Sequence, residues 1–270
     1  MINKKNKDLI FKAAILTQLK KKLLISNIKF NQNLSRGQVL IKLYYSGICG
    51  SQIGEINGVK GKDKFLPHLL GHEGTGIIVN KNKHVKKFKV GDRVILHWQK
   101  SEGYDSCSPN YFMGKKKINA GKVTTFNEFA VVSENRITKI PKGISEKEAV
   151  IFGCALTTGF GAVVYDAKVK NNKSILIFGA GGIGISIIQI LALTKPKKII
   201  IVDSNINKKK LLKKFKQKNF IHFDNNNYNK LKEKILNTND GDYFDYVFDT
   251  TGNGKIIELG LDLMLKKSKL

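Results

Sequence analysis

A short apolar strand that runs through a glycine-rich turn into an apolar helix limits the fold of this chain more than any other feature. Residues 174–178 read as a buried strand, the next six are Gly-Ala-Gly-Gly-Ile-Gly, and residues 182–193 read as a helix. Strands that alternate with helices are typical of parallel sheets. Downstream residues continue the alternation, with strands expected at 198–202, 220–223 and 244–248 and helices at 208–216 and 229–236.

The glycine turn matches the G-x-G-x-x-G pattern of dinucleotide-binding folds. Gly179 would allow the tight turn, Gly181 would let the backbone approach a pyrophosphate, and Gly184 would let the helix pack close to the sheet. The phosphates would meet N–H groups of the first helical turn, which contains Gly182 and Ile183. Asp203 ends the next strand, where it would bind the ribose diol and repel the extra phosphate of NADP. These residues predict NAD as cofactor, and the alternative is a glycine-tolerant helix start with an incidental aspartate.

The first half of the chain has a different pattern. Short segments rich in Val, Ile and aromatic residues are separated by glycines, with strands expected at 11–16, 39–45, 76–79, 93–98 and 128–132. Ser145 and Glu148 have capping-box spacing, so a helix is expected to start there. We therefore expect a mostly β domain over residues 1–150 and a dinucleotide-binding domain over residues 151–270.

The chain is strongly basic, with 48 Lys and Arg against 21 Asp and Glu and a formal net charge of +27. All but Arg36, Arg93 and Arg136 of these basic residues are lysines, and they are spread along the whole chain. Proteins that read DNA bases favour arginine, and proteins that bind single-stranded nucleic acid need aromatic residues interleaved with basic ones. Neither pattern is present in this chain. We expect no nucleic-acid partner, although a basic surface could steer anionic substrates.

Cysteine count and hydropathy indicate the compartment. Three scattered cysteines cannot form a disulfide framework, which favours a reducing environment. The sequence has no apolar run of about 18 residues and no secretory leader pattern. A cytoplasmic protein without a membrane partner is expected.

Two cysteines and a histidine stand in glycine-containing motifs far apart in the sequence. Cys49 lies in Gly47-Ile48-Cys49-Gly50-Ser51, His72 in Gly71-His72-Glu73-Gly74, and Cys154 follows Gly153. Two thiolates and an imidazole suit a catalytic zinc, which keeps a fourth position open. Taken separately, a buried free Cys is usually a small hydrophobe and a lone His a satisfied polar group. The residues alone therefore leave the metal site open.

Together these motifs and their order resemble the zinc-containing alcohol dehydrogenases of the medium-chain dehydrogenase/reductase superfamily. The resemblance also includes Gly91-Asp92-Arg93-Val94 and the glycine turn, and it runs from about residue 10 to the C-terminus. It implies an α/β protein in which an N-terminal GroES-like β domain precedes a Rossmann domain with a doubly wound parallel sheet.

The resemblance also implies roles for individual residues. Cys49, His72 and Cys154 resemble the ligands of one catalytic zinc, which would activate the alcohol oxygen. Glu73 resembles an acidic neighbour of the metal, and Ser51 the hydroxyl that takes the substrate proton.

Further residues resemble those that contact the cofactor in this family. Thr158 corresponds to a position near the nicotinamide, and Asp203 and Lys208 to positions around the adenosine ribose. The implied reaction transfers hydride between NAD and a small alcohol, polyol or aldehyde.

The sequence departs from the family pattern at several positions. Gln52 replaces an aspartate that bonds the zinc histidine in many members, although its amide oxygen could still accept from the imidazole. Gly54 occupies the place of a relay histidine, so the proton must leave by another group or water. Many members have four closely spaced cysteines that hold a structural zinc, but residues 100–122 contain a single cysteine, Cys107. No structural zinc is therefore expected. His97 and Trp98 could line the substrate cleft or be strand-end core residues.

The sequence also stops earlier than family members do. After residues 244–253 we expect one helix, so the Rossmann domain looks C-terminally incomplete and lacks the usual dimer edge, which bears on any homo-oligomer. The final Ser-Lys-Leu is interpreted as coincidence rather than a peroxisomal address. The alternatives to an active zinc enzyme are a catalytically impaired member that binds only NAD or a partner, and a zinc-free reductase of the same superfamily.

Overall fold

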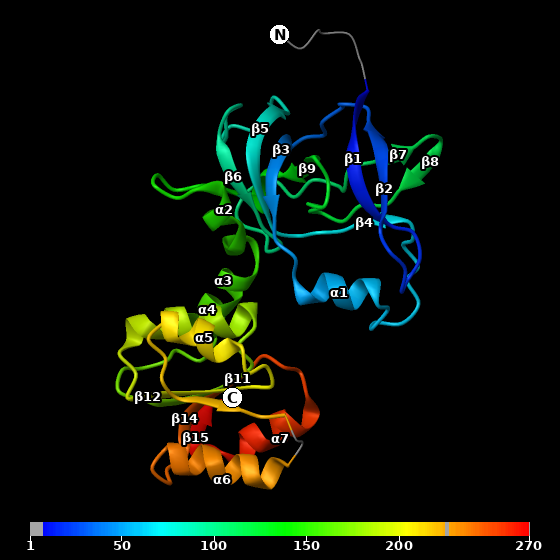
Figure 1. Ribbon diagram of the computed structural model, residues 1–270. Coiled ribbons are helices and arrows are strands. Elements are labelled where there is room, and N and C mark those ends of the chain that lie inside the picture. The colour runs from blue at the N-terminus through cyan, green and yellow to red at the C-terminus, as the bar shows by residue number, and fades with distance from the viewer. Residues whose placement is uncertain (1–7, 225–226, 270) are drawn as a thin grey trace. The chain divides into compact units, whose positions relative to one another are not determined.

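The computed structural model describes residues 8–224 and 227–269. The chain folds into two compact units, Met1–Cys154 and Ala155–Leu270. The first unit has two sheets and the second has one (Figure 1). Each unit has its own hydrophobic core.

The first unit contains two five-stranded antiparallel sheets. In spatial order one sheet contains β4 (His68–Leu69), β1 (Leu9–Leu16), β2 (Leu24–Phe30), β7 (Tyr111–Met113) and β8 (Lys116–Ile118). The other contains β10 (Ile137–Lys139), β6 (Arg93–Leu96), β5 (Gly74–Lys81), β3 (Gln38–Ser46) and β9 (Phe129–Ser133). The strands bury apolar side chains such as Ile15, Ile41 and Leu96 in two clusters.

Short helices connect these strands. They are α1 (Gly50–Ile56), the 3₁₀ helices Glu134–Arg136 and Val150–Gly153, and α2 (Glu146–Ala149). The predicted capping box is confirmed, because the Ser145 hydroxyl accepts from the Glu148 N–H and the Glu148 carboxylate accepts from the Ser145 N–H.

The second unit is a parallel five-stranded sheet in the order β13 (Phe220–His222), β12 (Lys198–Asp203), β11 (Ser174–Phe178), β14 (Phe244–Asp249) and β15 (Met264–Lys269). Its helices are α3 (Ala155–Phe160), the π-helical Gly161–Asp166, α4 (Gly182–Leu191), the 3₁₀ turn Ala192–Thr194, α5 (Lys208–Lys214), α6 (Tyr228–Thr238) and α7 (Gly254–Asp262). This strand order is that of the first Rossmann half extended by two strands.

Alternating side chains of β11 divide the core of the second unit into two layers. Ile175 and Ile177 pack with α4 and α5, whereas Leu176 and Phe178 pack with α6 and α7. Figure 1 shows these helix pairs on opposite faces of the sheet. The three-layer arrangement explains why β11 is buried on both faces, as its uninterrupted apolar sequence predicted.

An ion pair joins β11 and β14 at the start of the sheet. The Asp245 carboxylate accepts from the Lys173 ammonium over 2.8 Å and from the Ser174 N–H over 2.9 Å. Burial acts to raise the pKa of Asp245, but these hydrogen bonds and the lysine charge outweigh it and hold that pKa below its usual value.

Several elements differ from the sequence-based expectation. The structure adds the helices α1 and α3 and the strands β2, β4, β7, β8, β10 and β15. In particular, α7 does not end the fold, because β15 pairs with β14 as a fifth parallel strand.

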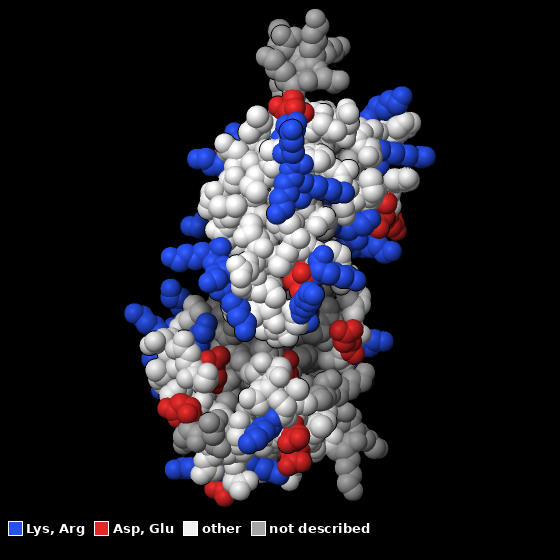
Figure 2. All heavy atoms as spheres, turned by 90° about the vertical axis from the view of Figure 1, so that its right-hand side faces the viewer, with Lys and Arg blue, Asp and Glu red and all other residues white. Residues whose placement is uncertain are grey.

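The surface and helix lengths bear on possible partners. Lys and Arg side chains are scattered over the face shown in Figure 2, with Asp and Glu between them. Among the described residues, no single helix is long and apolar enough to cross a membrane. Two short consecutive helices within residues 146–166 meet that criterion only when counted together.

Candidate functional site

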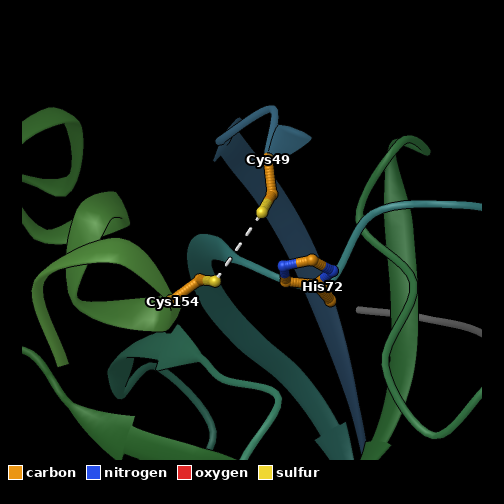
Figure 3. Close-up of side chains that lie close together, drawn as sticks. All are labelled: Cys49, His72 and Cys154. Carbon is orange, nitrogen blue, oxygen red and sulfur yellow. Dashed lines mark hydrogen bonds between the residues drawn. The ribbon is translucent and has the colours of Figure 1, made fainter. Parts of the chain in front are cut away.

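Three side chains from separate segments of the first unit converge on one point (Figure 3). Cys49 is the N-cap of α1 directly after β3, His72 lies between β4 and β5, and Cys154 is the C-cap of the helix Val150–Gly153. Their ligand atoms all lie within 4.8 Å of one another, and the side chains are half-buried. This is the one such group of three or more ligand-type side chains in the part of the chain that the structure describes.

The geometry of this group fits a zinc ion. The Cys154 thiol donates to the Cys49 sulfur over 4.0 Å, whereas a tetrahedron with Zn–S bonds of about 2.3 Å separates two sulfurs by about 3.8 Å. Burial lowers the pKa of His72, and the nearby Glu55 carboxylate partly opposes this shift. The neutral imidazole, which is the form that binds metal, is therefore favoured.

Glu73 is buried next to the three ligands, with 5% of its surface exposed. Two glycines make room for it. A Cβ on Gly47 would lie 2.6 Å from Glu73 Cδ, and a Cβ on Gly153 would lie 2.6 Å from both Glu73 Cβ and the Leu96 carbonyl oxygen. The residue that precedes Cys154 must therefore be glycine for the ligand segment to pass this close to Glu73.

The surroundings of His72 differ from the expectation for Gln52. The amide oxygen of Gln52 is buried and has no hydrogen-bond partner in the described chain, while its nitrogen donates to Glu55 Oε2 over 3.2 Å. Gln52 therefore does not accept from the imidazole. Ser51 is exposed in the first turn of α1, two residues after Cys49.

His97 and Trp98 have separate roles. Both ring nitrogens of His97 are engaged, one with the Gln99 carbonyl at 2.5 Å and one with the Thr138 hydroxyl at 3.0 Å, so this histidine is a structural residue. Trp98 is half exposed, and the centroid of its ring lies 6.3 Å from that of His72. Of the two, only Trp98 is placed beside the ligand group.

The glycine turn of the second unit is tightly constrained. Gly179 has φ +93°, and a Cβ there would lie 2.4 Å from the Thr250 hydroxyl. A Cβ on Gly184 would lie 2.0 Å from the Gly179 carbonyl oxygen, so this glycine lets the helix start pack against the turn itself. By contrast, a Cβ on Gly181, the N-cap of α4, would meet nothing within 4 Å. The backbone here is open to a ligand, as the approach of a pyrophosphate requires.

Asp203 and Thr250 hold this turn from two sides. Asp203 Oδ2 accepts from the Ala180 N–H over 2.6 Å, and Oδ1 accepts from the Asn205 N–H over 2.7 Å. The Thr250 hydroxyl donates to the Phe178 carbonyl over 2.9 Å. A carboxylate has about four acceptor positions, so Asp203 keeps capacity for ribose hydroxyls. Sequence reasoning missed Thr250, although its place after β14, beside the reversal of strand order, was a usable signal.

A hollow of about 220 Å³ lies at the carboxyl ends of β11, β12 and β14. Its lining includes Asp203 together with Phe223, Asp224, Tyr228 and Ile256. Apolar walls with a few acidic groups at this edge of a parallel sheet suit a nucleoside. Of the other predicted cofactor residues, Lys208 begins α5 and Thr158 is exposed on α3, while Gly182 and Ile183 begin α4.

The segment with the single Cys107 is held by hydrogen bonds. Ser106 is 2% exposed, and its hydroxyl donates to the Arg36 carbonyl over 2.5 Å while its N–H donates to the Ser133 hydroxyl over 2.8 Å. The Gln38 amide donates to the Cys107 carbonyl over 2.9 Å. Cys107 itself is exposed.

Comparison with known proteins agrees with this arrangement. The family profile described as the alcohol dehydrogenase GroES-like domain matches residues 35–142. An S-(hydroxymethyl)glutathione dehydrogenase from Photobacterium damsela subsp. piscicida is 28% identical over 84% of this chain and 68% of its own length. Alcohol dehydrogenase 6 from Peromyscus maniculatus is 30% identical over 83% of this chain and 65% of its own length.

Solved structures share the fold. An alcohol dehydrogenase zinc-binding domain protein from Burkholderia ambifaria has a TM-score of 0.84 at 20% identity, over 97% of this chain and 76% of its own. Benzyl alcohol dehydrogenase from Acinetobacter calcoaceticus has a TM-score of 0.80 at 23% identity, over 96% of this chain and 75% of its own. Sequence relatives, fold and the Cys-His-Cys group agree: residues 35–142 match the alcohol dehydrogenase GroES-like domain, and the chain is similar to the zinc-containing alcohol dehydrogenases of the medium-chain dehydrogenase/reductase superfamily.

Proposed function

We propose that this chain is a zinc-dependent oxidoreductase that transfers hydride between a small alcohol or polyol and NAD. The observation that carries the proposal is the convergence of Cys49, His72 and Cys154 to within 4.8 Å. Names of relatives, S-(hydroxymethyl)glutathione dehydrogenase among them, support the reaction class. They do not select one alcohol.

The three ligands would hold one catalytic zinc. Zinc bound there supplies a Lewis acid that lowers the pKa of an alcohol oxygen in the open fourth position. Ser51, exposed beside Cys49, would accept the alcohol proton and pass it to water, since Gly54 offers no side chain for a relay. Glu73 would place its buried carboxylate next to the ligand group.

The second unit would bind the NAD that accepts the hydride. The N–H groups at the start of α4, from Gly182 to Gly184, would bind the pyrophosphate, and Asp203 and Lys208 would contact the adenosine ribose. Asp203 already accepts two backbone N–H groups, and its negative charge opposes the extra phosphate of NADP. Thr158 would lie near the nicotinamide.

Partners and compartment follow from the same chemistry. Two reduced cysteines are needed as ligands, so we place the enzyme in the cytoplasm. The lysines are spread along the whole sequence, and we propose neither a nucleic-acid nor a membrane partner. Residues 100–122 offer a single cysteine, Cys107, which cannot hold a structural zinc, so one zinc per chain is proposed.

A Cys49→Ala variant tests the proposal. We expect loss of bound zinc and of alcohol-dependent NADH formation with NADH binding retained, because the glycine turn belongs to the other unit. Loss of NADH binding as well would contradict the assignment of the two sites. NADH binding without turnover in the unmodified chain would instead identify a binding-only member, and turnover without zinc would identify a metal-free reductase.

A further inference from the structure

Trp98 lies beside the ligand group, and its backbone is bonded to the segment that carries Cys154. Its N–H donates to the Gly153 carbonyl over 3.4 Å, one residue before Cys154. Its ring lies 6.3 Å from that of His72 at an angle of 57°. The residue is nevertheless 54% exposed, so packing against the protein does not by itself fix the orientation of its ring.

Arg136 supplies the missing support. Its Nη1 donates to the Trp98 carbonyl oxygen, and its Cζ lies 5.9 Å from the centre of the indole ring. The guanidinium is itself held, because its side chain is only 11% exposed and Nη2 lies 3.7 Å from the Asp105 carboxylate. The backbone adds a third link, from the His97 N–H to the Arg136 carbonyl over 3.0 Å.

The chemistry of arginine suits this arrangement. Its planar guanidinium can donate in its plane and lie over an aromatic ring at the same time, whereas a lysine ammonium is a point charge on a flexible stem. Only three of the 48 basic residues are arginines, and one of them stands at this position. His97 cannot follow a displaced Trp98, because both of its ring nitrogens are already bonded.

We propose that Arg136 is a positioning residue that holds the Trp98 indole beside His72 and thereby fixes one wall of the space in front of the metal ligands. The functional consequence rests on the proposed alcohol oxidation. A fixed indole limits the bulk that an alcohol can carry near its hydroxyl, so short unbranched alcohols are admitted over ring-bearing ones.

Because Trp98 is the only tryptophan in the chain, its fluorescence reports on this site without any turnover. The variants are Arg136→Lys and Arg136→Gln. The matched control is Arg36→Lys, because the Arg36 guanidinium lies over the ring of Tyr104, 5.1 Å from its centre, and not over Trp98. We expect both Arg136 variants to shift Trp98 emission and to increase its quenching by acrylamide, and the control to match wild type.

Unchanged emission and quenching in folded Arg136→Lys would overturn the proposal. Time-resolved anisotropy of the wild-type protein needs no variant and covers the case in which both variants misfold. A held indole should show little fast depolarisation, and a large fast component would overturn the proposal.

Kinetics then test the functional consequence. In Arg136→Lys the ratio of KM for a short alcohol to KM for a ring-bearing alcohol should rise about two- to fivefold, the factor expected for loss of one exposed cation–π contact, with kcat for the short alcohol kept. An unchanged ratio together with altered fluorescence would overturn the specificity role of Arg136. A chain with no activity but the expected fluorescence would instead refute the proposed function alone.

Discussion

Replacing Asp203 by alanine should loosen the glycine turn even before any cofactor binds. The Asp203 carboxylate accepts from the N–H groups of Ala180 and Asn205 at 2.6 and 2.7 Å. Asn205 is exposed, so water can replace the carboxylate there. Ala180 is 0% exposed, so its N–H would be left without a partner, which costs about 1–3 kcal/mol.

Hydrogen exchange measures this cost at the affected atom. In the cofactor-free protein, protection of the Ala180 amide should fall about 5- to 150-fold in Asp203→Ala, the factor equivalent to that free energy. Asp203→Asn keeps one oxygen acceptor, so its loss of protection should be smaller. The preference for NAD over NADP should weaken in both variants.

The reasoning would be refuted if Asp203→Ala left the Ala180 amide as protected as in wild type. A change in cofactor preference without a change in protection would mean that Asp203 acts on the ribose alone. A change in protection without a change in preference would mean that it acts on the turn alone.

Three further predictions concern single side chains. Gly153→Ala should displace Glu73 and lower bound zinc, measured by elemental analysis, whereas Gly121→Ala, whose Cβ meets nothing closer than 3.7 Å, should not. Ser106→Ala should lower the free energy of unfolding of the first unit by about 1–3 kcal/mol in urea titrations, because its hydroxyl donates to the Arg36 carbonyl; a change below measurement error would show that this hydrogen bond does not stabilise the segment. Asp245→Asn should lower the free energy of unfolding of the second unit at pH 7, because it removes the charge that pairs with Lys173. Because the folded-state pKa of Asp245 lies below the unfolded value, this difference should disappear as pH falls through the folded pKa, and a pH-independent difference would contradict the assignment.

Elements built on apolar periodicity or on glycine geometry could be predicted from the sequence. Strand β11, the glycine turn and the capping box at Ser145 each depend on neighbouring residues, so local sequence carries the whole signal. Strands β2 and β15 could not be predicted. In both, polar and lysine residues interrupt the apolar pattern, and the pairing with β1 or β14 decides the conformation.

The candidate metal site shows the same division. The motifs around Cys49, His72 and Cys154 were visible in the sequence, but their separation of up to 105 positions means that only the tertiary fold brings the ligand atoms together. The contact of Arg136 with Trp98 and the hydrogen bond from Thr250 to the Phe178 carbonyl join residues that are far apart in the sequence. No local pattern encodes such contacts, because they depend on how the strands pair.

The zinc content of the purified chain, after removal of loosely bound metal, tests the central claim most directly. Three protein ligands that leave a fourth position open hold one ion. We predict about one zinc per chain in the unmodified protein and none in Cys49→Ala. Zinc absent from the folded chain, or retained in full by Cys49→Ala, would contradict the assignment of the Cys49, His72 and Cys154 group as a catalytic metal site.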